Sequence, residues 1–448
     1  MISITSFFIF ICTLYIMYRH VLYPKAYSIA SGYDYRFFVF FYIVCLLGLG
    51  GIIAAMYPDL NSVLKRTTES GFLLGSVLIF VFLIIYIVLS AFLDVIERRY
   101  FSEKIVNNKK YSSLNGISIF CCLSVFLTVI IIAAYGFPQT LLFKGLSAYD
   151  LAYTRTTDLH NSTLIPSFFR KILARDLSVF LSFVLYARLC LQQADKNDIN
   201  VKKIKILLVL TILCAVYNVS FELSKSKLVE YFLFLFLIRS TVNYSFFRKQ
   251  PRLFYLFFIF SGFTALLVFI FSLAYPELEL IDVINYFISR LFVSQISPFY
   301  YVSGIVFNSS EKLGDLFDMF TYLGEVFKLT DFFAPAQQLT QRLFYDDYTS
   351  GTMNYLSTFF ASDVLWSFGL WFFPFASIYV IFLLRFTAIL RAYGFPREIF
   401  IGISAVVFYG SNFMSSFFSF ILSSTIIFVI LVSLFISTKL GIVVRKRV

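Results

Sequence analysis

Long apolar runs dominate the chain and recur from its first residues to its last. In a helix that rises 1.5 Å per residue, about 20 apolar residues cross the roughly 30 Å hydrocarbon core of a bilayer. Such runs occupy residues 2–18, 37–57, 71–93, 114–136, 172–192, 205–221, 228–246, 253–275, 356–384, 399–416 and 418–438. The pattern predicts an all-α, polytopic membrane protein with about eleven transmembrane helices, in which residues 1–448 form a single transmembrane domain.

The loops between these runs predict an orientation. The loop over residues 94–113 is rich in lysine and arginine, and short basic loops stay in the cytoplasm. Alternation from this loop places residues 193–204, 247–252, 385–398 and the C-terminal tail on the same side, and all of these segments are basic. We therefore expect a cytoplasmic C-terminus and an N-terminus on the opposite, outer side.

Two long segments, 137–171 and 276–355, fall on the outer side and form its first and second large loops. Within the second, residues 281–296 place polar side chains on one helical face and apolar ones largely opposite. The polar face holds Asp282, Asn285, Tyr286, Ser289 and Arg290, and the apolar face holds Ile281, Ile284, Ile288 and Leu291. Residues 313–327 show a second amphipathic pattern. Both patterns predict helices lying at the outer lipid–water interface.

Composition excludes several other classes of protein. Hydrophobic residues make up 60% of the chain and charged residues 14%, whereas soluble domains carry about a quarter charged residues. The net charge of +12 comes from short basic clusters between apolar runs, a distribution that suits lipid headgroups and not nucleic acid. The six cysteines lie in or beside apolar runs without a C-x-x-C pair, and there are two histidines, so we expect neither a metal site nor a cofactor.

Cations on the outer side are the exceptions to the positive-inside rule, and they are the first candidates for chemistry. They include Arg155, Arg170, Lys171, Lys225, Lys227, Arg290 and Arg342. Cations that converge above a helix bundle would bind a pyrophosphate or another anionic headgroup. The alternative is that each one extends separately to ordinary lipid phosphates.

Three outer residues are candidates for a general base. His160 lies near Arg155, and a neutral imidazole there would accept a proton from a sugar hydroxyl, although a solvated loop histidine is the simpler interpretation. Asp282 and Glu222 are the alternative bases, because each lies close in sequence to a basic residue.

Two other acidic positions carry weaker signals. The adjacent pair Asp346–Asp347 resembles a carboxylate pair that binds a divalent ion, but such pairs are usually solvated turns. Asp363 falls inside an apolar run, where a carboxylate is costly unless it is functional or paired.

The whole layout resembles the polymerases of bacterial O-antigen and related repeat-unit polysaccharides. The resemblance lies in the number of spans, two large periplasmic loops with external cations, and the turn Ser224-Lys225-Ser226-Lys227 that opens a helix. The run from Asn354-Tyr355 to Trp366-Ser-Phe-Gly369 is similar to the segment after the family's second loop. The chain has lysines where the family often has an arginine in the short turn. It also lacks the family's arginine-to-glycine spacing after Arg290 or Arg342.

The resemblance implies a location, a fold and a reaction. The location is the bacterial inner membrane, with a periplasmic N-terminus, and the fold is the GT-C-like architecture shared by ligases and polymerases. The reaction is a metal-independent, inverting glycosyl transfer at the periplasmic face, in which a glycan leaves undecaprenyl pyrophosphate and joins a lipid-linked repeat unit. Undecaprenyl-pyrophosphate-linked oligosaccharides and membrane lipids are then the expected partners, and a chain-length regulator protein is a further candidate.

Two alternatives to a polymerase share much of this plan. A flippase for lipid-linked oligosaccharides would handle the same lipid without chemistry, but such exporters usually have short external loops, unlike residues 276–355. An O-antigen ligase would share nearly every feature. An acyltransferase would need an external histidine paired with an acid, and His160 is the external histidine of this chain.

Overall fold

The computed structural model describes most of the chain in several stretches. They cover residues 2–22, 39–100, 111–136, 165, 169–194, 200–221, 225–247, 261–262, 264–265, 268–269, 272, 279–308, 320–321, 335–349, 359–392, 395–410 and 424–444. Within these stretches every regular element is a helix and no strand occurs, so the predicted all-helical class is confirmed there.

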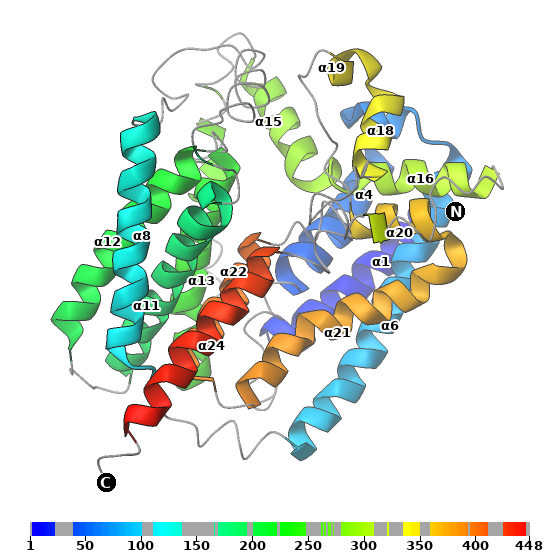
Figure 1. The fold of residues 1–448 in the computed structure, drawn as a ribbon. Helices are drawn as coiled ribbons and strands as arrows, with labels where there is room; N and C mark the ends of the chain where they lie inside the picture. Colours follow the sequence, from blue (N-terminus) through cyan, green and yellow to red (C-terminus); the bar gives the residue numbers. More distant parts are fainter. Residues whose placement is uncertain are drawn as a thin grey trace.

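The N-terminal part of the chain contributes a first group of helices. They are α1 (Ile2–Met17), the π-helices η1 (Tyr18–Leu22) and η2 (Val39–Gly50), α4 (Gly51–Met56), the 3-10 turn η3 (Pro58–Leu60), α5 (Ser62–Lys65) and α6 (Glu69–Tyr100). Helix α1 contacts η2 and α6. In Figure 1 the long helix α6 runs from the end of the molecule where α15, α18 and α19 lie toward the end where the C-terminus lies.

A second group of helices follows. It consists of α8 (Leu114–Tyr135), the π-helix η5 (Phe169–Asp176), α11 (Leu177–Ala194), α12 (Val201–Phe221) and α13 (Lys225–Phe247). Helix α11 packs against α8, α12, α13 and α22 (Arg397–Gly410). Its side chains Phe180, Phe183 and Val184 are fully buried. An apolar helix surrounded by other helices is typical of the centre of a bundle.

The C-terminal half of the chain returns to both groups. Its remaining elements are α15 (Leu280–Ile288), the π-helix η6 (Ser289–Val293), α16 (Ser297–Asn308), α18 (Pro335–Leu343), α19 (Tyr345–Thr349), α20 (Phe360–Phe368), the 3-10 turn η7 (Leu370–Phe372), α21 (Phe373–Ala392) and α24 (Ser424–Val444). Helices α16, α20 and α21 join α6, whereas α22 and α24 join α11 and α8. The contact between α21 and α22 links the two groups.

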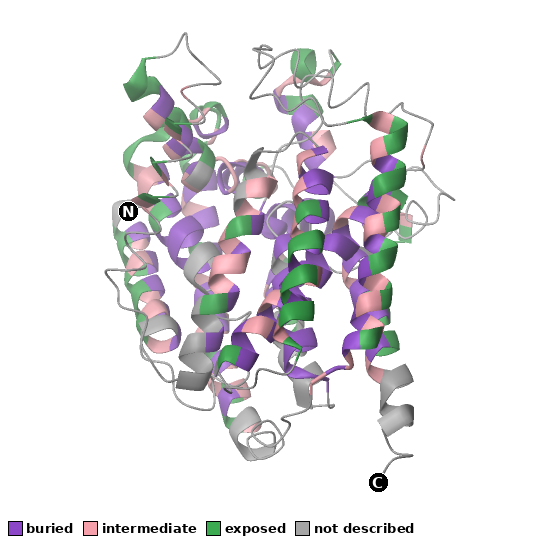
Figure 2. Ribbon diagram, turned by 90° about the vertical axis from the view of Figure 1, so that its left-hand side faces the viewer, coloured by how far each residue is buried: buried purple, intermediate pink, exposed green. Residues whose placement is uncertain are grey.

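Among the described residues, three helices are long and apolar enough to cross a membrane: Glu69–Ile96, Leu114–Tyr135 and Val201–Phe221. Shorter apolar helices cover Ile4–His20, Ile43–Met56, Leu370–Phe382 and Thr425–Ser437. Helix α8 exposes large apolar side chains such as Ile119, Phe126 and Val129, and Figure 2 shows exposed positions along the outward faces of long helices. Exposed apolar surface of this kind suits lipid and not water. The chain therefore has membrane-protein character, while the total of about eleven spans stays a prediction.

The predicted span over residues 356–384 is wrong as a continuous helix. Helix α20 ends at Phe368, and Gly369 adopts a φ of +74°, a left-handed conformation that ends helices. The backbone N–H of Gly369 donates to the carbonyl oxygen of Leu365 at 3.1 Å, and the chain restarts as α21 after η7. Helix α20 itself is buried from Phe360 to Ser367. This run thus forms two helices, because a glycine inside it terminates the first.

The second large outer segment contains a buried helix in addition to a surface helix. Helix α16 is buried from Ser297 to Tyr300 and again from Val302 to Gly304, and it packs against α6 and α20. Gly71 of α6 allows this contact, because a Cβ atom on Gly71 would lie 2.6 Å from the Cα atom of Gly304. Tyr300 stacks on Phe72 with ring centroids 4.3 Å apart. Small residues that let two helix backbones approach closely are typical of helix packing in membranes.

The predicted amphipathic helix at residues 281–296 corresponds to α15 and η6. Asp282, Asn285, Tyr286 and Arg290 are exposed, as the pattern predicts, whereas Ser289 is buried. The buried side consists of Val283, Phe287 and Val293, and Ile281 is exposed. The predicted apolar face is therefore rotated. The π-helix η6, which carries Val293, packs against η2 and α4. The second predicted amphipathic helix, 313–327, lies outside the described residues except for 320–321.

Candidate functional site at the outer end of the bundle

Side-chain contacts join segments that the sequence assigns to the same side. At the end we call the inner end, Arg188 of α11 donates to the carbonyl oxygen of Ser112 at 2.6 Å, and Ser112 donates to Glu398 of α22. Arg19 also pairs there with Asp94 at 3.1 Å. All five residues border or lie in segments predicted to be cytoplasmic.

At the opposite end, which we call the outer end, side-chain contacts also join segments that are distant in the sequence. Asn61 donates to the hydroxyl of Ser294 at 3.4 Å. Thr425 donates to Asp176 at 2.6 Å, and Arg66 donates to the carbonyl oxygen of Leu343. Helices α15, α18 and α19 lie at this end of the molecule in Figure 1. Two predicted outer segments, 58–70 and 276–355, therefore meet at one end of the bundle, which is where a periplasmic site would form.

Arg170 lies at the outer end, packed between aromatic rings. Its guanidinium carbon is 5.9 Å from the ring centroid of Tyr135 and 5.5 Å from that of Phe221. The residue is 9% exposed. Attraction between a cation and the faces of two rings holds the charge at the junction of α8, α12 and η5. Arg170 thus places its guanidinium group beside Phe221, the last residue of α12.

Lys227 lies in the first turn of α13, the helix that follows α12 along the chain. Its Nζ atom is 3.0 Å from Oε2 of Glu230 and 5.6 Å from the ring centroid of Tyr409. It also donates to the carbonyl oxygen of Tyr409 at 3.5 Å. The lysine is about one-third exposed, so its charge still faces open space. Arg170 therefore contacts the last residue of α12, and Lys227 lies near the start of the next helix along the chain.

Three other predicted residues lie on the exposed surface of α15, η6 and α18. Asp282 and Arg290 occupy the polar face of α15 and η6, with Asn285 and Tyr286 between them. Eight residues separate Asp282 from Arg290, which corresponds to about 12 Å along a helix. Arg342 lies exposed at the end of α18, next to Leu343, the residue whose carbonyl oxygen Arg66 binds. These residues lie at the outer end of the first, N-terminal group of helices, whereas Arg170 and Lys227 lie at the outer end of the second group.

Four of the remaining predicted residues have no described side chain, and three acidic ones do. His160, Glu222 and Arg155 lie outside the described residues, and Lys225 is described only as the first residue of α13. Asp363 is buried in α20, and Asp346 and Asp347 are exposed on α19. Within the described stretches, no group of three or more histidine, cysteine, aspartate or glutamate side chains comes together.

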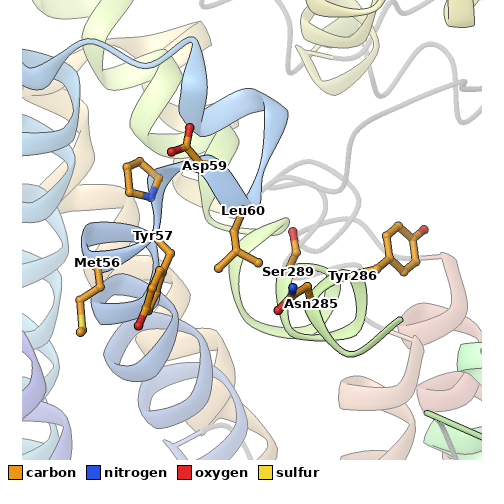
Figure 3. A pocket seen from close by; sticks show the side chains of 8 residues that line it. Met56, Tyr57, Asp59, Leu60, Asn285, Tyr286 and Ser289 are labelled. Atoms are coloured by element: carbon orange, nitrogen blue, oxygen red, sulfur yellow. The ribbon is translucent and has the colours of Figure 1, made fainter. Parts of the chain in front are cut away.

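A pocket opens beside the polar face of α15. Its volume is about 430 Å³, and two walls form it: the end of α4 with the turn that follows, and the α15–η6 junction. Figure 3 shows Asn285 and Ser289 beside Leu60, Tyr57 on the opposite wall, and Tyr286 at the outer edge. The lining comprises Met56, Tyr57, Pro58, Asp59, Leu60, Asn285, Tyr286 and Ser289. Such a site offers hydrogen-bonding groups within an otherwise apolar and aromatic surface.

Sequence reasoning identified one wall of this pocket and missed the other. The polar period of residues 281–296 predicted the α15 wall, whereas residues 57–60 were assigned to the end of a span and the short turn after it. Arg66 was also missed as an outer cation. The sequence does hold a signal for Arg66. The alternation of loops places residues 58–70 on the outer side, where lysine and arginine are unexpected.

No protein-family model, curated protein or solved structure matches the chain. The function is therefore argued from the site.

Proposed function

We propose that the chain is a membrane glycosyltransferase that polymerises lipid-linked repeat units at the periplasmic face of the bacterial inner membrane. The observation that carries this proposal is the exposed face of α15 and η6. A carboxylate, Asp282, and a guanidinium, Arg290, lie on one polar surface, with the residues of a pocket between them. This surface lies at one end of a bundle whose outward faces are apolar.

The proposed reaction needs a base and a group that stabilises a leaving pyrophosphate. The hydroxyl oxygen of the acceptor sugar attacks the anomeric carbon of the glycan on undecaprenyl pyrophosphate, and the carbon–oxygen bond to pyrophosphate breaks. The hydroxyl proton passes to Asp282, and the new negative charge on the pyrophosphate is stabilised by Arg290. The products are a glycan lengthened by one repeat unit and free undecaprenyl pyrophosphate.

The second group of cations has a role in the same proposal. Arg170 contacts the rings of Tyr135 and Phe221, and Lys227, near the start of the next helix, contacts the ring of Tyr409. A cation on a fixed, partly dehydrated support attracts an anion more strongly than a freely solvated one. We assign these two residues to the headgroup of a second lipid-linked substrate, because a polymerase holds two such lipids at once.

The experiment is the lipopolysaccharide ladder of cells that lack this chain. If the chain is the polymerase, the long glycans should be replaced by core plus a single repeat unit, and the wild-type gene should restore the long glycans. Loss of all glycan from the core would favour the ligase or the flippase, and persistence of long chains would exclude the polymerase. Complementation with Arg290→Ala should fail at normal protein level, whereas Lys205→Ala, a control that removes an exposed cation at the inner end, should succeed.

A further inference from the structure

The pocket beside α15 has walls that are fixed to each other. Gly50, at the end of η2, leaves no room for a side chain against the carbonyl oxygen of Phe292 in η6. On the other side, Asn61 donates to the hydroxyl of Ser294 at 3.4 Å, and this hydroxyl donates to the carbonyl oxygen of Ser289 at 2.9 Å. Asn61 also accepts from the backbone N–H of Val63. Contacts on both flanks therefore hold the pocket in a preformed shape.

The chemistry of the lining selects against an anionic ligand. The lining contains a carboxylate, Asp59, but, as far as the described residues show it, no lysine or arginine. Lys65 approaches Asp59 at 3.8 Å from outside the lining, and Arg290 follows Ser289 on the adjacent exposed surface. In this pocket a pyrophosphate would be repelled by the carboxylate of Asp59 and would find no cation in the lining to bind it.

The same lining suits a neutral sugar. A pyranose presents hydroxyl groups around its edge and apolar C–H groups on its faces. Asn285, Ser289 and Asp59 supply donors and acceptors for hydroxyls, and the ring of Tyr57 with Leu60 supplies flat apolar surface. The volume of about 430 Å³ lies within the range of about 300–1,000 Å³ that small-ligand sites occupy.

We propose that this pocket binds the terminal neutral sugar of the acceptor repeat unit. The assignment rests on the proposed function and adds a specificity site to it. A sugar held here lies beside the polar face of α15, so its free hydroxyl is presented toward Asp282, while the charged pyrophosphate stays outside the pocket. Tyr57, Asp59, Asn285 and Ser289 then determine which sugar is accepted.

The test measures sugar binding apart from catalysis. The probe is the oligosaccharide released by mild acid from the lipid-linked repeat units of cells that lack this chain, so it carries no lipid and no pyrophosphate. Binding to the full-length protein in nanodiscs is followed by saturation-transfer NMR. Tyr57→Ala and Asn285→Ala should each weaken binding at least tenfold. The matched controls Tyr345→Ala and Gln341→Ala, which change exposed residues outside the pocket, should bind as the wild type does.

Two results would overturn the pocket assignment while leaving the polymerase intact. One is equal binding by the wild type and both pocket variants, and the other is displacement of the oligosaccharide by inorganic pyrophosphate. The polymerase proposal fails by a different observation, namely that cells lacking the chain still make long glycans. Each variant is also checked for wild-type protein level and elution as a single species, so that loss of binding is not loss of folding.

Discussion

Replacing Glu398 should strongly destabilise the inner end of the bundle. This carboxylate has no exposed surface, and its Oε1 atom accepts from the backbone N–H of Ser112 at 2.6 Å and from its hydroxyl at 2.7 Å. Arg188 lies 3.8 Å from the same oxygen, is 9% exposed at its side chain, and packs 5.5 Å from the ring centroid of Tyr111. One carboxylate thus holds the starts of α8 and α22 and the end of α11 together.

The magnitude follows from what Glu398→Ala leaves behind. The substitution removes two hydrogen bonds to a charged acceptor, each worth about 1.5–3 kcal/mol, and leaves a buried guanidinium without its carboxylate. Removing one partner of a buried ion pair typically costs about 3–5 kcal/mol. Glu398→Gln keeps the shape and one acceptor oxygen, so its cost should be smaller, about 1–3 kcal/mol.

The assay is reversible unfolding in mixed micelles by added dodecyl sulfate. Four proteins are compared: the wild type, Glu398→Gln, Arg188→Met and the double variant. If the pair interacts, the double variant should lose about 0.5–3 kcal/mol less than the two single losses combined. If the losses in unfolding free energy of the two single variants simply add, Arg188 and Glu398 do not stabilise each other, and the three segments do not meet as described.

The remaining predictions concern packing, charge and sidedness. Gly71→Ala should lower the unfolding free energy by about 1–2 kcal/mol, since its Cβ would press on the backbone of α16. Gly262→Ala, whose added Cβ meets no atom of the described residues within 4 Å, should be neutral or stabilising, and the same micelle titration measures both. Lys227→Ala should change the free energy of unfolding by no more than about 0.5 kcal/mol relative to the wild type, because its ion pair is partly exposed. The same variant should polymerise at least tenfold more slowly. Lost stability with an unchanged polymerisation rate would contradict the headgroup role. With the six native cysteines replaced, a cysteine at Asp346 should react with an impermeant maleimide in intact cells and one at Lys203 should not; the reverse would invert the orientation.

Much of the helical framework could be predicted because it depends on local sequence. The runs 71–93, 114–136 and 205–221 predict α6, α8 and α12 to within a few residues at most ends, since long continuous apolarity in this composition permits little besides a helix. The polar face of α15 was equally accessible, because a period near 3.6 places Asp282, Asn285 and Tyr286 together.

The rest depends on contacts between distant parts of the chain. Gly369 ends α20 because it adopts a left-handed conformation, yet other glycines in apolar runs remain within helices, so sequence alone does not separate the two cases. Burial of α16 requires Gly71 and Gly304 to meet, and the pocket requires the turn after α4 to face α15. No local pattern contains these pairings.

The central claim is that the outer face of α15 and η6 carries out glycosyl transfer. The most direct measurement is elongation of lipid-linked repeat units by the purified chain in nanodiscs, with products separated by length. We expect a ladder of glycans for the wild type and for the control Asp346→Asn, and at least a hundredfold slower elongation for Asp282→Asn and for Arg290→Ala. Elongation at the wild-type rate by both of these variants would mean that this face does not catalyse glycosyl transfer.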